Sequence, residues 1–341
     1  MKRLMMRWIV VGACGLGLMP RPLALAAGPD VKRVGVAELG PDTDAAITRG
    51  LNYLAARQNE DGSWGDKYKA AETSLALMAF MVKGHFPNQG AYGAKLDKGV
   101  AFLLRRGQEG AGYFGTKQQG MYEHGLATLA LSEVWGESDR DEIKEMLKKA
   151  VKVILGAQNQ EGGWRYGTAP QDADLSVTVM QLVALTSAKE AGIHVPDEVF
   201  NKAVAYVLAC QHPLGGFAYQ PRQEPGFART AAGVLSLCMT GQRNSQAMQA
   251  GVNYLIKQPD SKFTRTEFYY YGQYYAIQSM YQSGEANYQA WYPKIRDALL
   301  PRQRPDGSWQ DSEGGTTPVY STSMSILILG VPYRFLPIYQ R

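Results

Sequence analysis

The sequence is poor in the residues that build disulfide scaffolds and metal sites. It has 3 cysteines and 4 histidines among 341 residues, which excludes a small disulfide-stapled fold. It also lacks an apolar run as long as a bilayer span. After the first 26 residues the charge is nearly balanced, with 32 basic against 31 acidic residues. Such a chain lacks the excess of positive charge that binds nucleic acid, so we expect no nucleic-acid partner.

The first 26 residues have the pattern of a secretory signal peptide. A basic start and a short apolar stretch lead to Ala24-Leu25-Ala26, whose small residues are typical of a cleavage site. We therefore expect a signal peptide at 1–26, an N-terminal extension at 27–43 and one domain at 44–341. The protein is then exported to the periplasm or the extracellular space. An uncleaved membrane anchor and a lipoprotein modified at Cys14 are the alternatives.

Export would leave two cysteines, Cys210 and Cys238, in a compartment where disulfides persist. Cys210 ends one predicted helix and Cys238 lies inside the next. Because a bridge requires these two segments to touch, we expect two separately buried thiols; a disulfide is the alternative.

One motif recurs along the chain: Gln, three residues, Gly, one residue, Trp. Weaker copies begin at Gln108, Gln211 and Gln258, so that six copies follow one another at intervals of 45 to 53 residues. A fixed period of this length is typical of a repeat architecture. The complete copies are Gln58 to Trp64, Gln158 to Trp164 and Gln303 to Trp309.

Each repeat predicts two helices of different character. The segment before each glutamine is amphipathic, most clearly over 143–154, and the segment after each aromatic residue is apolar nearly all round, as over 177–185. We expect an outer helix with one solvent-exposed face and an inner helix that is covered on both sides. Neither end of the chain shows a polar capping repeat, so the hairpins are expected to close on themselves. The predicted fold is an all-α (α/α)6 toroid, a double ring of six helical hairpins.

These repeats resemble those of squalene–hopene and oxidosqualene cyclases and, more distantly, the β subunits of protein prenyltransferases. The resemblance covers Asp44 to Tyr333 and implies a single-domain, exported member of the prenyltransferase/squalene oxidase repeat family. In the motif, the glycine allows a tight turn, while the glutamine and tryptophan join adjacent repeats. We therefore expect structural roles for Gln58, Trp64, Gln158, Trp164, Gln303 and Trp309.

The six inner helices are expected to point their N-termini at one mouth, where free N–H groups and helix dipoles favour an anion. Glu72 begins the first of these helices, and Phe268–Tyr275 supplies the densest aromatic stretch. Aromatic walls suit a carbocation, an apolar chain or a sugar ring; the alternative is that these rings only fill the barrel. The candidate ligand-binding residues are Glu123, His124, Arg229, Tyr270, Tyr271, Tyr274 and Tyr320.

Two of these candidates suggest contact with an anion. The segment Glu123–Gly125 resembles the His-Gly segment with which prenyltransferase β subunits help hold a diphosphate, which implies an anion contact for His124. Arg229 is suited to a phosphate or carboxylate, or else to an ion pair with Asp172 or Asp174.

Asp172 and Asp174 are the candidate catalytic residues. The sequence Asp172-Ala-Asp174-Leu175 resembles the Asp-x-Asp-Asp motif from which the cyclases protonate their substrate. The resemblance implies that Asp174 is the proton donor, and burial in an apolar cavity would raise its pKa as that role requires. Leu175 departs from the motif. The alternative is that one of the two aspartates caps the helix that begins near Leu175.

Three function classes remain. The first is a toroid that binds an isoprenoid or other extended apolar ligand and, if it is an enzyme, carries out acid-initiated cyclase, isomerase or prenyl-transfer chemistry. The second is a non-catalytic scaffold that meets a protein partner through its mouth or its C-terminal tail. The third is an (α/α)6 glycan hydrolase or lyase, which needs two opposed carboxylates. The zinc ligands of the prenyltransferases are missing, and no other Cys/His spacing is typical of zinc, so we expect neither metal nor cofactor.

Overall fold

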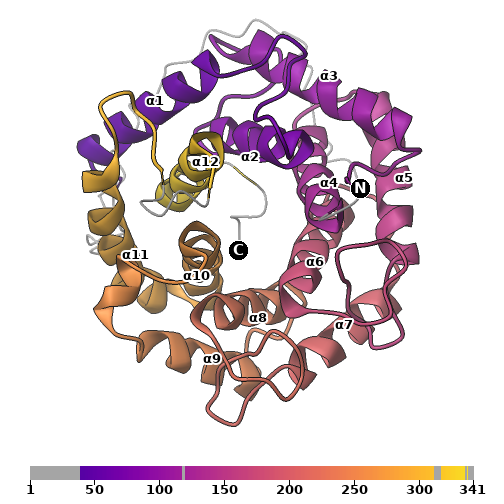
Figure 1. The fold of residues 1–341 in the computed structure, drawn as a ribbon, viewed down its shortest axis with the longest axis vertical. Coiled ribbons are helices and arrows are strands. Elements are labelled where there is room, and N and C mark those ends of the chain that lie inside the picture. Colours follow the sequence, from indigo (N-terminus) through magenta and orange to yellow (C-terminus); the bar gives the residue numbers. More distant parts are fainter. Residues whose placement is uncertain (1–38, 117–119, 311–315, 335, 337–341) are drawn as a thin grey trace, which may run out of the picture. The chain divides into compact units, whose positions relative to one another are not determined.

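The computed structural model describes residues 39–116, 120–310, 316–334 and 336, all within one unit that spans Ala37–Arg341. In these residues twelve α-helices form two concentric rings (Figure 1). The predicted all-α toroid is confirmed. The expected signal peptide, Cys14 and most of the N-terminal extension lie outside the described residues.

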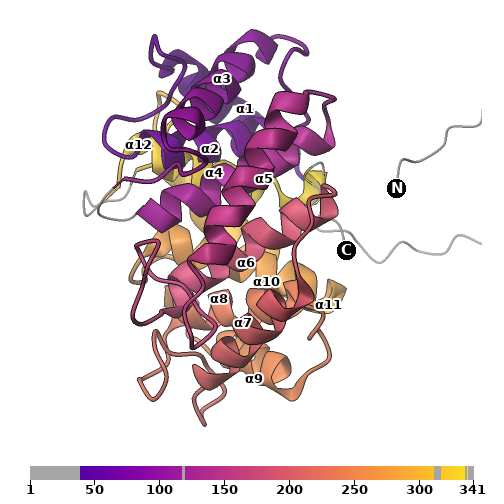
Figure 2. The same ribbon diagram turned by 90° about the vertical axis from the view of Figure 1, so that its right-hand side faces the viewer.

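Outer and inner helices alternate along the chain, as the repeat predicts (Figures 1 and 2). Three short 3-10 turns interrupt this order: η1 (Asp260–Phe263), η2 (Leu300–Arg302) and η3 (Val331–Tyr333). The outer helices are α1 (Pro41–Ala56), α3 (Gly93–Glu109), α5 (Asp141–Gly156), α7 (Asp197–Ala209), α9 (Gln246–Ile256) and α11 (Glu285–Leu299). The inner helices are α2 (Lys69–Met81), α4 (Gly120–Gly136), α6 (Leu175–Glu190), α8 (Phe227–Met239), α10 (Tyr269–Ser283) and α12 (Pro318–Leu329).

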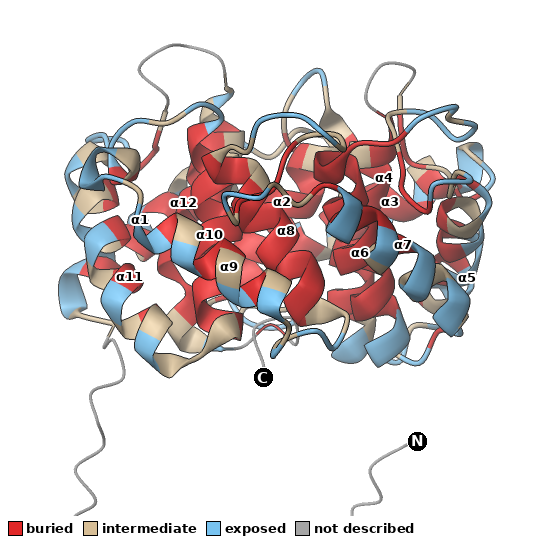
Figure 3. Ribbon diagram, turned by 90° about the horizontal axis from the view of Figure 1, so that it is seen from below, coloured by how far each residue is buried: buried red, intermediate tan, exposed pale blue. Residues whose placement is uncertain are grey.

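Burial divides the two rings as the sequence pattern predicts (Figure 3). In α5, Ile143, Leu147 and Ile154 are fully buried, while the other face of the helix is exposed. In α6, every residue from Leu175 to Ala188 is buried. Burying one leucine or isoleucine side chain contributes roughly 1.5–3 kcal/mol, so the inner ring supplies most of the apolar burial that holds the domain together.

The repeated glutamines hydrogen-bond across the seams between hairpins. The Gln58 amide donates to the carbonyl oxygens of Gly62, at 2.9 Å, and of Lys95 in the next outer helix, at 2.7 Å. Gln158 bonds in the same way to Gly162 and Val199. Each amide therefore closes its own turn and holds the beginning of the next hairpin.

The repeated tryptophans are fully buried and hydrogen-bonded. Their indole N–H groups donate to the carbonyl oxygens at the ends of the preceding outer helices, at 2.7 Å for Trp64 and 2.8 Å for Trp164. Each of these carbonyls also accepts one backbone N–H, from Arg57 and Ala157 respectively, so the indole supplies a second hydrogen bond at the helix end.

The same contacts close the ring between its last and first hairpins. The Gln303 amide donates to the Ala46 carbonyl of α1 at 2.8 Å, and α12 packs against both α1 and α2 (Figure 1). The Trp309 ring lies so close to Gly50 of α1 that a Cβ atom there would approach it to 2.9 Å. The first and last repeats thus meet through the contacts that join internal repeats.

Gly307→Ala, at this seam, is expected to lower the free energy of unfolding more than Gly90→Ala does. Both glycines have a positive φ, 88° and 63°, so both variants incur the roughly 1–2 kcal/mol cost of a left-handed alanine. A Cβ atom at position 307 would lie 2.5 Å from the Arg49 carbonyl oxygen, whereas position 90 has no atom within 4 Å. We expect an additional loss of about 1–3 kcal/mol for Gly307→Ala, measured by urea unfolding. Equal losses would contradict this account of the seam.

Candidate functional site

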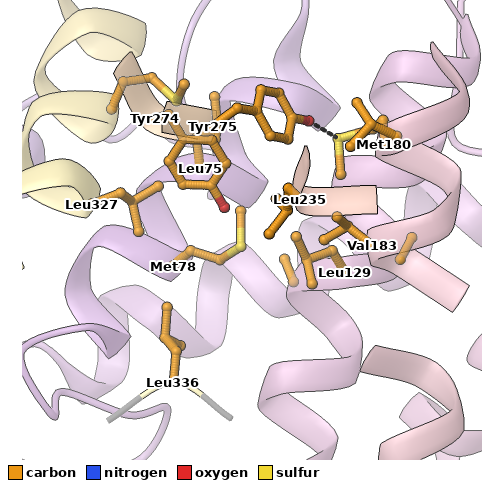
Figure 4. Packing of buried hydrophobic residues seen from close by; sticks show 14 of the residues in the cluster. Leu75, Met78, Leu129, Met180, Val183, Leu235, Tyr274, Tyr275, Leu327 and Leu336 are labelled. Carbon is orange, nitrogen blue, oxygen red and sulfur yellow. Dashed lines mark hydrogen bonds between the residues drawn. The ribbon is translucent and has the colours of Figure 1, made fainter. Parts of the chain in front are cut away.

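A cavity of about 820 Å³ lies at the end of the ring where the inner helices begin. Its wall includes eight tyrosines and two phenylalanines, together with apolar side chains such as Leu75 and Met180. The volume falls within the range of small-molecule sites, roughly 300–1,000 Å³. One helical turn below Leu75, the ring is filled by apolar side chains that include Met78, Val183 and Leu336 (Figure 4). The cavity is therefore open toward the helix starts and closed by apolar packing below.

The structure divides the predicted ligand-binding residues into two groups. Tyr270 is buried behind the wall, with its ring centre 6.5 Å from that of Tyr320. His124 also lies outside the wall. The candidates that line the cavity are Glu123, Arg229, Tyr271, Tyr274 and Tyr320.

The predicted anion contact of His124 is corrected by its surroundings. The ring is fully buried, its Nδ1 accepts the Phe114 N–H at 3.4 Å and its Nε2 lies 3.0 Å from the Ala150 carbonyl oxygen of α5. Nε2 must then carry the proton and donate it, since a carbonyl oxygen only accepts. Burial lowers the pKa of His124 to about 4. A neutral imidazole that is engaged on both nitrogens holds α4 to α5 and does not reach the cavity.

Asp174 caps α6, as the alternative interpretation expects. Its Oδ1 accepts the Val177 N–H at 2.9 Å, and its Oδ2 lies 3.4 Å from a guanidinium nitrogen of Arg165. Burial raises the pKa of Asp174 to about 6, against the opposing effects of the Val177 N–H and Arg165. Its side chain is not part of the cavity wall. Asp172 is half-exposed and lies 3.6 Å from Arg165 Nε, also outside the wall.

Arg165 is a residue that the sequence interpretation missed, although it directly follows the repeated Trp164. Its guanidinium lies 4.9 Å from the ring centre of Tyr166 and 5.4 Å from that of Tyr219, distances at which a cation is attracted to an aromatic face. The hydroxyls of these two tyrosines hydrogen-bond to each other. Both tyrosines line the cavity, so Arg165 holds Asp174 and part of the wall together.

Arg229 pairs with neither predicted aspartate. Its guanidinium lies 3.7 Å from a Glu267 carboxylate oxygen, and both side chains line the cavity. The alternative of an ion pair with Asp172 or Asp174 is therefore wrong, because Arg165 occupies that position. Lys262 also lines this side of the cavity, which places basic groups on the wall formed by α8 and η1.

The opposite wall carries two buried carboxyl groups, one at the beginning of each of α2 and α4. Glu72 is 3% and Glu123 is 2% exposed, and both line the cavity. Among the described residues neither has an ion-pair partner within 4.0 Å. Burial raises the pKa of each, while hydrogen bonds from threonine side chains oppose the rise. Acids of this kind hold a proton to higher pH than usual.

Cys210 and Cys238 are both buried, and neither is bridged, which confirms the prediction of two separate thiols. Burial raises the pKa of Cys210 to about 12 and that of Cys238 to about 11, so neither is a reactive thiolate at neutral pH.

Across 39–116, 120–310, 316–334 and 336, no three His, Cys, Asp or Glu side chains gather as metal ligands would. In the same ranges, no helix combines the length and the apolar character needed to cross a bilayer.

Comparison with protein families gives one match to a family model, the prenyltransferase alpha-alpha toroid domain, over residues 37–268. Drimenyl diphosphate synthase from Streptomyces showdoensis is 27% identical over 203 residues, which make up 58% of this chain and 34% of that protein. The chain thus spans about a third of the length of this curated relative.

Solved structures share the architecture at low sequence identity. A variant of the type II terpene cyclase MstE from Scytonema, in complex with geranylgeranyl dihydroxybenzoate, has a TM-score of 0.63 at 16% identity, covering 86% of this chain and 98% of that one. The GH76A alpha-1,6-mannanase from Salegentibacter sp. has a TM-score of 0.63 at 8% identity, with the same coverage. Identities this low show a common fold and leave the chemistry to be argued from the cavity.

Proposed function

The chain belongs to the prenyltransferase alpha-alpha toroid family, and from that premise we propose that its cavity binds an isoprenoid or another extended apolar chain and starts an acid-catalysed isomerisation of it. The observation that carries the proposal is a cavity of about 820 Å³ whose wall is largely apolar and aromatic. Two buried carboxyl groups lie on the wall formed by α2 and α4, while the Glu267 carboxylate on the opposite side is paired with Arg229. Such a wall binds hydrocarbon by burial and stabilises a cation through its aromatic faces.

The relatives support this choice of ligand. One relative is named drimenyl diphosphate synthase, and MstE is named a type II terpene cyclase. A scaffold that only meets other proteins would not need an internal cavity. Leu75, Leu126, Met180 and Met324 lie among the aromatic and charged residues of the wall, and they supply apolar surface that a hydrocarbon chain uses and a glycan does not.

Export remains part of the proposal. The signal-peptide pattern of residues 1–26 supports it, and it favours a lipid-borne ligand over a free prenyl diphosphate, because such anions do not cross the bilayer interior unaided. The intact mass of protein purified from the periplasm or the medium would show whether residues 1–26 have been removed. A mass that retains them would contradict cleavage.

The binding proposal predicts that filling the cavity abolishes ligand retention. Purified protein is incubated with geranylgeraniol, washed and extracted, and the retained lipid is measured by mass spectrometry. Met180→Trp places a larger side chain in the cavity and is expected to reduce retention at least tenfold, because the added ring occupies the volume of the ligand.

The matched control is Leu214→Trp, since Leu214 is 70% exposed on an outer loop; it should retain as much geranylgeraniol as the wild type. Equal retention by both variants would place the binding elsewhere, and no retention by the wild type would refute the proposal for this ligand class.

A further inference from the structure

The two buried glutamates of the cavity differ in how their oxygens are bonded, and this difference assigns them different roles. The inference rests on the proposed function, because it concerns the acid that starts that reaction. Glu72 stands in the first turn of α2 and Glu123 in the first turn of α4, and these two helices pack side by side in the inner ring (Figure 1).

One hydrogen bond decides which oxygen of Glu72 can carry a proton. Thr317 caps α12, where its Oγ1 accepts the Tyr320 N–H at 3.1 Å. The single hydroxyl hydrogen of Thr317 is directed to Glu72 Oε2, at 2.8 Å. Oε2 is therefore an acceptor, which leaves Oε1 as the oxygen that can hold a proton.

The backbone at Gly65 covers the other side of the Glu72 carboxyl group. A Cβ atom at Gly65 would lie 2.5 Å from Oε2 and 2.8 Å from Oε1, and its φ of 77° is one that glycine adopts without cost. Only a bare backbone fits so close to the carboxyl group. The Gly65 backbone thus covers part of the Glu72 carboxyl group, while the side chain still lines the cavity.

Glu123 lies in surroundings that favour its charged form more strongly. Its Oε1 accepts two hydrogen bonds from Thr116, from the backbone N–H at 3.1 Å and from the hydroxyl at 2.6 Å. A backbone hydrogen bond from Ala70 and the nearby charge of Arg106 act in the same direction. At Glu72, by contrast, the neighbouring charge is that of Asp66, which disfavours ionisation. Two acids whose surroundings differ in this way commonly divide into a proton donor and a proton acceptor.

Asp174 is less suited to the donor role. One of its oxygens caps α6 and the other faces Arg165, and its side chain does not line the cavity. From this geometry we infer that Glu72 is the proton donor of the cavity and Glu123 the proton acceptor, acting on an isoprenoid double bond.

The step balances without a cofactor. The proton leaves Glu72 Oε1 as a C–H bond forms with the π electrons of one double bond of the chain. The resulting cation is attacked by the next double bond, which forms a C–C bond, and the final cation loses a proton to the Glu123 carboxylate. The product is an isomer of the substrate, and solvent exchange returns the proton from Glu123 to Glu72.

The first test uses geranylgeraniol as the probe in D2O. Wild-type protein is expected to give an isomer that carries one carbon-bound deuterium, measured by mass spectrometry after re-exchange of the hydroxyl in H2O. Glu72→Gln keeps the acceptor for Thr317 but has no acidic proton, so product formation should fall at least about 100-fold while the probe is still retained. Glu133→Gln is the matched control, because Glu133 is a buried glutamate of α4 that does not line the cavity.

The outcomes separate the two proposals. Product that survives Glu72→Gln and disappears in Asp174→Asn overturns the assignment of the donor. Retention of the probe by wild type without any product overturns both the donor assignment and the proposed isomerisation, and leaves the proposed binding of an apolar chain standing. Absence of retention refutes the binding proposal instead.

A second measurement tests, without any turnover of substrate, whether the Glu72 carboxyl group carries a proton. Infrared spectra at neutral pH should contain a protonated carboxyl band that disappears in Glu72→Gln and persists in Glu133→Gln. Thr317→Val removes the hydrogen bond to Oε2 and should shift this band to higher frequency, since a carbonyl free of hydrogen bonds vibrates faster. A spectrum in which Glu72→Gln removes no such band would refute the role of Glu72 as donor.

Discussion

Trp309→Ala is expected to lower the free energy of unfolding by about 3–5 kcal/mol, the range for deleting a large aromatic side chain from a core. Trp309 is fully buried, its indole N–H donates to the Leu299 carbonyl at 2.9 Å and its backbone N–H donates to Thr322 Oγ1 at 3.0 Å. Its ring also packs on Gly50 of α1. The variant therefore leaves a cavity at the seam that closes the ring.

Guanidinium chloride unfolding would measure the loss, with Trp309→Phe as the control. Phenylalanine already occupies the same motif position at Phe217, where it is fully buried. It keeps most of the ring volume and loses only the N–H donor, so it should cost less than half as much as alanine. If both variants cost the same, the effect belongs to the hydrogen bond and not to packing across the seam.

Asp174→Asn is expected to change how stability depends on pH. The pKa of Asp174 is about 6 in the folded protein against 3.8 for the unperturbed group. A raised pKa means that the folded state binds the proton more tightly. The stability from this group is therefore fully present below the unfolded pKa and is lost as the pH rises through about 6, an effect of about 3 kcal/mol. Asparagine keeps the helix cap but does not titrate.

Relative to wild type, Asp174→Asn should therefore gain stability between about pH 4 and pH 7. His124→Gln should show the opposite sign. The folded pKa of His124 is about 4 against 6.5, so its stability is present above the unfolded pKa and is lost as the pH falls through about 4, again by about 3 kcal/mol. Urea unfolding at a series of pH values measures both differences. Curves for the two variants that move in the same direction would contradict the burial assigned to one of them.

The fold could be predicted from the sequence because its signal is repeated. Gln58, Gln158 and Gln303 make equivalent hydrogen bonds in the structure. Each copy of the motif therefore predicts, independently of the others, the same contact between adjacent hairpins. The alternation of amphipathic and apolar helices then orders the two rings, since only a helix that is covered on both sides can be apolar all round.

The site was predicted only in part, because an inner helix has no exposed face to fix its rotation. Glu123 and His124 are neighbours in α4, yet one faces the cavity and the other faces α5. Tyr270 and Tyr271 divide in the same way in α10. Their order along the chain places them at the mouth, but about 100° of helix rotation separates adjacent residues.

The sequence places Glu72 and Glu123 at the beginnings of inner helices, but it does not show the contacts that distinguish them. Thr116 bonds to Glu123 within one repeat, whereas the partner of Glu72 comes from the last repeat. Thr317 reaches Glu72 across 245 residues of chain, and Arg165 comes between the aspartates and Arg229. Export and cleavage at residues 1–26 stay predictions.

The ring can close only after its last repeat has been synthesised. The hydrogen bond between Gln303 and Ala46 spans 257 residues, and synthesis proceeds at roughly 5–20 residues per second. The face of α1 that packs against α12 leaves the ribosome roughly tens of seconds before α12 has been synthesised. Until then the nascent chain is unclosed, and the apolar face of α1 is exposed to solvent. Its dependence on chaperones should therefore be greatest just before the twelfth helix emerges.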